Sequence, residues 1–221
     1  MAGQLSSGER EFESLVAQLR ALEDDIGAAR QIAHRTPSGG GLHLHREPPP
    51  VLYGERVRLA DGAEIVVRQV EPADVRELAI GFERLGALSR YRRFRGQIDR
   101  PTREQLAELT DIDHESHEAI VAFDAATGAL VGIARYIRMP AEPARADVSC
   151  TVLDPWQHRG VGSVLADRLA ARARAAGIKL CTAMIVLGDN PARRLLAHVA
   201  DEIDEKRDGG TVDITARARP R

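Results

Sequence analysis

The most informative part of the sequence is LDPWQHRGVGS, residues 153–163. It follows an apolar run that is typical of a strand, and Pro155 prevents that strand from continuing. An amphipathic helix is expected next, from about Gly160 to Ala176. Gly160 and Gly162 let the backbone approach a ligand closely, and the free N–H groups at the start of a helix favour an anion. The stretch therefore predicts a diphosphate-binding loop or, equally well, a tight turn without a ligand.

Strand-like and helix-like segments alternate on both sides of this stretch. We expect strands at residues 56–59, 64–70, 119–123, 129–137, 146–153, 178–186, 202–207 and 211–217. We expect helices at residues 71–85, 89–94, 102–110, 160–176 and 191–199. The short connections favour antiparallel neighbours. The sequence therefore predicts an α/β (α+β) protein whose mixed, mostly antiparallel central sheet is flanked by helices.

Residues 1–50 differ in character from the rest of the chain. Apolar residues repeat every three or four positions over about 9–34, which predicts an extra N-terminal helix. Such a helix can form a homodimer, pack on its own domain or remain a loosely held arm. Residues 36–50, TPSGGGLHLHREPPP, are typical of a linker that glycines loosen and prolines stiffen. We therefore expect one folded domain at 51–221.

Composition excludes several classes of protein. With 43% hydrophobic and 29% charged residues, the 221-residue chain can bury a core, and it is not disordered throughout. A net charge of −2 argues against a nucleic-acid partner, which would favour a basic excess. No apolar run approaches the roughly 20 residues that a membrane span needs, and the first residues lack the apolar core of a signal sequence, so we expect neither membrane insertion nor secretion. Two cysteines are too few for a disulfide framework, so we expect a cytoplasmic protein.

The pattern Gln157-x-x-Gly160-x-Gly162, between an apolar strand and an amphipathic helix, resembles the acetyl-CoA signature of the GCN5-related N-acetyltransferase (GNAT) superfamily. The surrounding order of elements is similar to that family over about residues 55–219. The resemblance implies the GNAT fold and an acetyltransferase that transfers an acetyl group from acetyl-CoA to an amine. It also implies that acetyl-CoA is a co-substrate and that no metal is needed.

Four further segments resemble a narrower group, the acetyltransferase modules of bacterial protein lysine acetyltransferases. They are LSRYRRF at 88–94, LTDID at 109–113, HEAIVA at 117–122 and GIARY at 132–136. Those enzymes modify acyl-CoA synthetases and related enzymes, so the resemblance implies a protein lysine as the acceptor. Two alternatives stay open, namely a small-molecule amine acetyltransferase and a non-catalytic acyl-CoA-binding module.

The resemblance also implies the residues that bind the co-substrate. The end of the strand, at Val152 and Leu153, would pair its backbone with the pantetheine arm, and an N–H there would stabilise the oxyanion of the transfer. The glycine stretch would hold the diphosphate, and an Asn that opens the next short helix would bond the pantetheine. The remaining implied residues are Gln157, His158, Arg159, Gly160, Val161, Gly162, Ser163 and Asn190.

The candidate base is Asp147, which stands where the related lysine acetyltransferases have a Glu. A carboxylate there can accept the amine proton, and the shorter Asp side chain favours a relay through water. The other interpretation is a solvent-facing Asp beside Arg145 at the edge of a strand. Many enzymes of this fold have a Tyr as general acid after the Asn, but this chain has Ala197 there, so the leaving group must be protonated in another way.

Weaker candidates have both a functional and a structural interpretation. His114 and His117 lie among acidic residues, but we favour a structural or substrate-loop role over a metal site. Trp156 can flank the co-substrate or anchor its loop. A third group is a basic face for an acidic partner or for coenzyme phosphates, or else an ordinary solvated helix edge. It consists of Arg90, Arg92, Arg93 and Arg95, with Tyr91 and Phe94.

Overall fold

A computed structural model describes residues 52–94 and 101–219. The predicted helix at 9–34, the linker at 36–50 and the domain boundary after residue 50 lie outside this part of the chain. Among the helices in the described ranges, none combines the length and apolar character needed to cross a membrane.

The order of elements follows the predicted order closely. The strands are β1 (Glu55–Arg58), β2 (Glu64–Gln69), β3 (His117–Asp124), β4 (Leu130–Met139), β5 (Glu142–Val152), β6 (Leu180–Val186), β7 (Ala200–Asp208) and β8 (Thr211–Ala218). The α-helices are α2 (Val75–Glu83), α3 (Ala87–Phe94), α4 (Arg103–Thr110), α5 (Val161–Ala175) and α6 (Asn190–Val199). Two short 3-10 turns, η1 (Pro72–Asp74) and η2 (Asp154–Trp156), complete the described chain.

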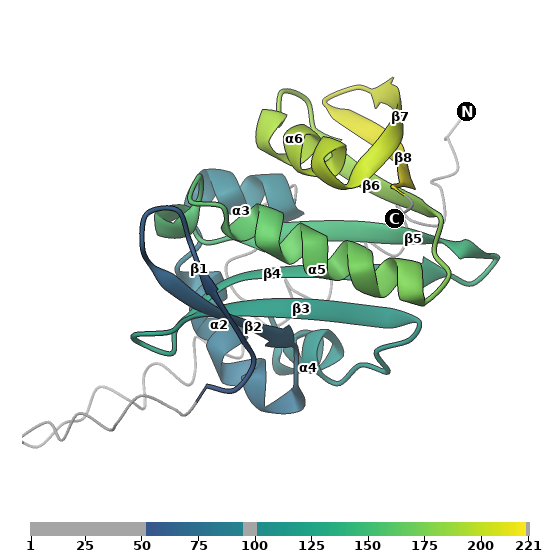
Figure 1. Cartoon of the computed structure of the whole chain (residues 1–221). Helices are drawn as coiled ribbons and strands as arrows, with labels where there is room; N and C mark the ends of the chain where they lie inside the picture. Colours follow the sequence, from purple (N-terminus) through teal and green to yellow (C-terminus); the bar gives the residue numbers. More distant parts are fainter. Residues whose placement is uncertain (1–51, 95–100, 220–221) are drawn as a thin grey trace, which may run out of the picture.

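All eight strands form one sheet in the order β1-β2-β3-β4-β5-β6-β8-β7 (Figure 1). Every neighbouring pair is antiparallel except β5 and β6, which are parallel because α5 carries the chain across one face of the sheet between them. The mixed, mostly antiparallel sheet and its flanking helices confirm the predicted fold class.

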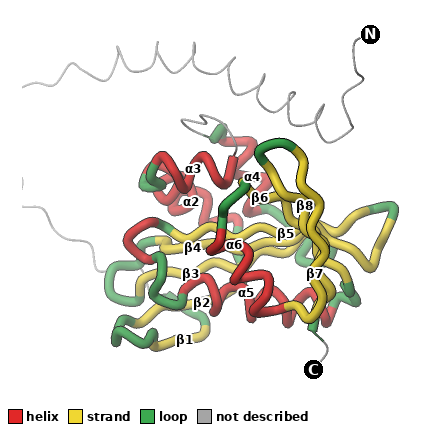
Figure 2. Tube along the Cα trace, turned by 90° about the horizontal axis from the view of Figure 1, so that it is seen from above, coloured by secondary structure: helices red, strands yellow, loops and turns green. Residues whose placement is uncertain are grey.

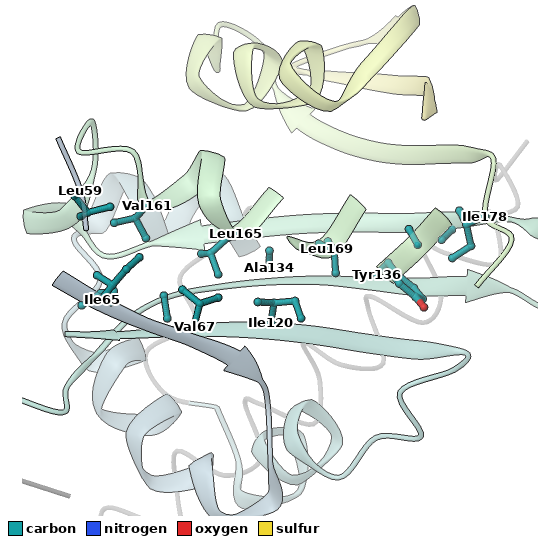
Figure 3. Packing of buried hydrophobic residues seen from close by; sticks show 14 residues of the cluster. Leu59, Ile65, Val67, Ile120, Ala134, Tyr136, Val161, Leu165, Leu169 and Ile178 are labelled. Atoms are coloured by element: carbon teal, nitrogen blue, oxygen red, sulfur yellow. The ribbon is translucent and has the colours of Figure 1, made fainter. Parts of the chain in front are cut away.

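Helices cover both faces of the sheet, as the view from above shows (Figure 2). On one face, α5 packs over β3 and β4, and Leu165 and Tyr136 are among the fully buried side chains between them (Figure 3). On the other face, Leu78 of α2 and Leu106 of α4 pack against Phe123. Because side chains alternate along a strand, each buried strand contributes apolar residues to both cores.

The sheet opens between β5 and β6. The two strands are in register only over Arg145–Asp147 and Leu180–Thr182, although β5 continues to Val152 and β6 to Val186. On its other side β6 pairs with β8 along its full length, through seven residue pairs from Leu180 to Val186. The strands therefore part in the middle of the sheet, and the functional site lies at this opening.

Candidate active site

A cavity of about 550 Å³ occupies the opening between β5 and β6. Its walls include Ala166 and Leu195 of α5 and α6 on one face of the sheet, and Ser89 and Arg93 of α3 on the other. The cavity is therefore lined by residues from both faces of the sheet.

The edge of β5 turns backbone groups toward this central cavity, and of these Val152 O already accepts a hydrogen bond from Gln157 Nε2. Backbone groups in an antiparallel strand point alternately to its two neighbours. Leu153 N–H donates to Val131 O of β4 over 2.9 Å, whereas Ala146 O accepts a hydrogen bond from Thr182 of β6. By the same alternation, the residues that point their backbone N–H and C=O groups toward the opening are Val148, Cys150 and Val152. Leu153 is therefore engaged within the sheet, while Val152 can pair with an extended ligand.

The loop from Gln157 to Gly162, here called the glycine loop, ends at the start of α5 and borders the cavity. Two of its residues have left-handed backbone conformations, His158 with φ of 60° and Gly160 with φ of 95°. No atom lies within 4 Å of the position that a Cβ would take on Gly160, so an approaching ligand meets bare backbone there. First-turn N–H groups have no carbonyl partner within a helix, and the helix dipole adds positive potential. The bare backbone at Gly160 and the first-turn N–H groups of α5 together fit a diphosphate.

A hydrogen-bonded chain fixes the glycine loop to α3. Gln157 Nε2 donates to Val152 O and to Ser89 Oγ, both over 3.0 Å. Ser89 Oγ donates to Asp154 over 2.7 Å, and the same carboxylate accepts Gly86 N–H over 2.8 Å. Burial acts to raise the pKa of Asp154, but these two hydrogen bonds outweigh it and the pKa is lowered. The loop and the first turn of α3 therefore move as one unit.

Arg159 lies beside the cavity rather than in its wall. Its guanidinium stacks on Trp156, 4.1 Å from the ring centroid, and its Nε donates to Asp61 Oδ2. That hydrogen bond is the main reason why the pKa of Asp61 is lowered. Trp156 also packs against the core cluster under α5, so it anchors the glycine loop as well as the arginine.

The structure brings six of the implied residues together in the cavity wall. They are Val152, Gln157, His158, Gly160, Gly162 and Ser163. Of the others, Val161 has a buried side chain. Asn190 is exposed in the first turn of α6 and outside the wall, where the preceding Asp189 stands instead. Asp189 caps α6 through Ala192 N–H and lies 4.0 Å from Arg92 Nε across the cavity.

Asp147 lies where the sheet begins to open. It is the last residue of β5 in register with β6, opposite Thr182, and the next residue, Val148, lines the cavity. β5 is an interior strand of the sheet, and the side chain of Asp147 is exposed, so both the role of base and that of a solvent-facing Asp stay predictions. Along β5, Val148, Cys150 and Val152 pack with the core under α5. Asp147 therefore faces the α3 side.

Both cysteines line the cavity, a role that their apolar surroundings in the sequence did not indicate. Burial raises the pKa of Cys150 to about 12 and that of Cys181 to about 11. Both therefore remain protonated thiols at neutral pH, and a thiol is a poor nucleophile compared with a thiolate.

His114 contacts a buried carboxylate that joins several elements of the fold. His114 Nδ1 lies 2.7 Å from Oε1 of the fully buried Glu118, whose other oxygen accepts hydrogen bonds from Gln69 and Arg172. The buried carboxylate thus joins β2, β3 and α5. Within residues 52–94 and 101–219, no group of three or more His, Cys, Asp or Glu side chains is arranged to hold a metal ion.

Comparisons with known proteins agree with this architecture. Residues 86–200 match the family model described as the acetyltransferase (GNAT) family. Acetyltransferase Pat of Mycolicibacterium smegmatis is 31% identical over 156 residues, which are 71% of this chain and 46% of Pat. Acetyltransferase PA5475 of Pseudomonas aeruginosa is 31% identical over 123 residues, 55% of this chain and 66% of that protein. The chain thus spans less than two thirds of either relative.

Among solved structures, the GNAT domain of S. lividans PAT superposes with a TM-score of 0.66 at 26% identity. The superposition covers 74% of this chain and 96% of that domain.

Proposed function

Because the chain belongs to the acetyltransferase (GNAT) family, we propose that its central cavity binds acetyl-CoA and an amine acceptor from opposite faces of the sheet. The protein is an acyltransferase of the GNAT type, and enzymes of this family use acetyl-CoA as co-substrate. The observation that carries the proposal is the opening of the sheet beside the glycine loop.

The donor half of the site consists of backbone groups. Bound acetyl-CoA supplies a thioester whose carbonyl carbon is open to attack by an amine. The N–H groups at the start of α5, from Gly160 to Ser163, would hold its diphosphate. The free edge of β5 would pair with the pantetheine arm. Val152 N–H would then donate to the thioester oxygen as negative charge develops there.

The acceptor half lies on the α3 side of the sheet, where Asp147 is exposed. Attack needs a neutral amine, so a group must take up its proton. We assign this role to Asp147, which accepts the proton through a water molecule because its side chain is short. Ala197 offers no hydroxyl to the leaving thiolate, so that group takes its proton from solvent.

Direct transfer of the acetyl group from the thioester to the amine, without an acyl-enzyme, fits the residues that line the cavity. An acyl-enzyme mechanism would need a nucleophile in the wall, and Cys150 and Cys181 are both held as protonated thiols. The acceptor amine would therefore attack the thioester itself. Kinetics with both substrates varied should give intersecting rather than parallel reciprocal plots.

A protein lysine is the proposed acceptor, and acyl-CoA synthetases are the first proteins to test. The similarity to Pat supports this choice, although the chain spans only 46% of Pat. A cytoplasmic location would supply acetyl-CoA and keep both cysteines reduced. The 51–221 domain boundary and a homodimer through residues 9–34 remain predictions.

The test combines a binding and a transfer measurement on the full chain. Calorimetry with acetyl-CoA should detect binding, and mass spectrometry should find acetyllysine on a purified acyl-CoA synthetase only when enzyme and acetyl-CoA are both present. Free lysine at matched amine concentration is the comparison. Transfer to the free amine alone would contradict a protein substrate, and binding without transfer to any amine would contradict an enzyme.

A further inference from the structure

Two arginines flank Asp147 on the acceptor side. Arg93, in the last turn of α3, lines the cavity. Arg135 of β4 is in register with Ser149 of β5, which also lines the cavity. Residues in register on antiparallel strands share a face, so Arg135 and Ser149 lie on the same face as Asp147. Arg93 therefore borders the cavity from α3, and Arg135 lies on the same face of the sheet as Asp147, next to a cavity-lining residue of β5.

Within the described part of the chain, neither guanidinium is hydrogen-bonded to a carboxylate, although Asp147 and Glu108 lie near enough to attract them. Arg93 stacks on Phe94, 5.0 Å from the ring centroid, but no hydrogen bond or ion pair joins it or Arg135 to a described residue. Other half-buried arginines here are paired. Arg68, for example, donates to both oxygens of the buried Asp74 over 2.6 and 2.7 Å.

The two groups remain cationic at neutral pH. Burial lowers the pKa of both, that of Arg135 to about 10, and their mutual repulsion contributes to the shift of Arg135. Asp147 attracts both cations and Glu108 attracts Arg135, but neither carboxylate reaches hydrogen-bonding distance. A desolvated cation without a paired anion costs free energy. An anionic group that arrives with the substrate would remove that cost.

Apolar side chains extend the same surface. Ile137 of β4, beyond Arg135 on the same face, is 39% exposed, and Met139, past a register shift in the strand pair, is 38% exposed. An extended peptide can lie along such a strip while its lysine reaches Asp147. A strongly basic peptide would be repelled by the two arginines, whereas an acidic side chain next to the lysine would be attracted.

We propose that Arg93 and Arg135 form a subsite for an Asp or Glu side chain close to the acceptor lysine of the protein substrate. This inference rests on the proposed function, because it requires a peptide acceptor. The bond expected is a charge-assisted hydrogen bond from guanidinium to carboxylate, which is roughly twice as strong as a neutral one.

The test uses three peptides that differ only at one position, two residues from a single lysine, where they carry Glu, Gln or Lys. Steady-state acetylation by the full chain should give kcat/KM in the order Glu, Gln, Lys, with about tenfold between the first and the last. The difference should lie mainly in KM for the peptide. Arg135→Gln should remove the preference, and Arg135→Glu should reverse it toward the Lys peptide.

Two controls separate this subsite from other effects. Arg58→Glu makes the same charge change on the exposed strand β1, away from the cavity, and should leave the peptide preference unchanged. Calorimetry with acetyl-CoA should give the same affinity for Arg135→Gln as for wild type, which also verifies that the variant is folded.

Each other outcome overturns the inference in a recognisable way. Equal kcat/KM for all three wild-type reactions would overturn it and leave the proposed function intact. If Arg135→Gln lost affinity for acetyl-CoA but kept the peptide preference, Arg135 would contact acetyl-CoA and not the peptide. Binding of acetyl-CoA without acetylation of any peptide would overturn both the inference and the proposed acceptor.

Discussion

Arg159 Nε donates to Asp61 Oδ2, although the two residues are 98 positions apart in the sequence. The contact joins the glycine loop to the turn between β1 and β2, and it holds the guanidinium beside the cavity rather than over the first turn of α5. Arg159 must leave Asp61, at least in part, before it can contact a bound diphosphate. Asp61 is therefore a competitor for the arginine that the donor site would use.

Asp61→Asn should tighten acetyl-CoA binding by roughly two- to fivefold, because the arginine is released from an ion pair of ordinary surface strength. Calorimetry at low salt measures the effect. Glu55→Gln is a matched control, because it frees Arg168 from a similar ion pair outside the cavity wall. An unchanged affinity in Asp61→Asn would mean that Arg159 does not bind the donor.

Gly160→Ala should weaken acetyl-CoA binding at least tenfold, because a methyl group would stand where the diphosphate approaches the backbone. The substitution also strains a residue with φ of 95° by about 1–2 kcal/mol. Gly177→Ala is the control for strain, since Gly177 has φ of 77° and open space around it at the other end of α5. Both variants should lose similar stability in thermal melts, but only Gly160→Ala should lose affinity.

Asp147→Asn should lower kcat by about 100-fold or more, because it removes the proton acceptor and preserves the shape of the side chain. Asp147→Glu should keep most of the activity, since the longer carboxylate reaches the amine more directly. The exposed Asp204 on the edge strand β7 offers a control, and Asp204→Asn should behave as wild type. Normal turnover in Asp147→Asn would show that another group accepts the proton of the amine.

Leu165→Ala should reduce the free energy of unfolding by about 2–5 kcal/mol, because it opens a cavity in the core between α5 and the sheet. Leu165 Cδ1 lies 3.0 Å from the position of a Cβ on Gly132, so no side chain of β4 can fill the space at that point. Urea denaturation measures the loss. Leu187→Ala, at a position 48% exposed, should change stability by no more than about 0.5 kcal/mol.

His117 should make the fold sensitive to moderate acid. Burial, and then repulsion by Arg135, lower its pKa in the folded state from 6.5 to about 4. As the pH falls, His117 of the unfolded chain takes up a proton before His117 of the folded protein does. The stability that the neutral, buried His117 contributes is therefore fully present above about pH 6.5 and is lost toward pH 4. Melting temperatures measured between pH 7 and 4 should fall less steeply for His117→Gln. The same slope in both proteins would contradict the prediction.

Local signals in the sequence predicted most of the fold. Apolar periodicity located every strand and helix of the described chain to within a few residues, and the glycine stretch located the start of α5. These features depend on neighbours three or four positions away, which a sequence pattern displays directly.

Contacts between distant residues could not be predicted in this way. The pairing of Arg159 with Asp61 and the position of Arg135 beside Asp147 depend on how the strands are ordered in the sheet. The residue that lines the cavity at the start of α6 was not predicted either. The family resemblance implied Asn190, but the residue that lines the cavity is Asp189, the N-cap that precedes the helix.

The opening between β5 and β6 has a consequence for how the molecule unfolds. Three residue pairs join the two halves of the sheet, whereas β6, β8 and β7 are joined to one another along their full lengths and share a small core around Ile214. Units linked by so few backbone hydrogen bonds open separately from the rest of a protein. In amide hydrogen exchange, the C-terminal strands should form a cooperative unit of lower protection, and a ligand bridging the opening should slow exchange on both sides at once.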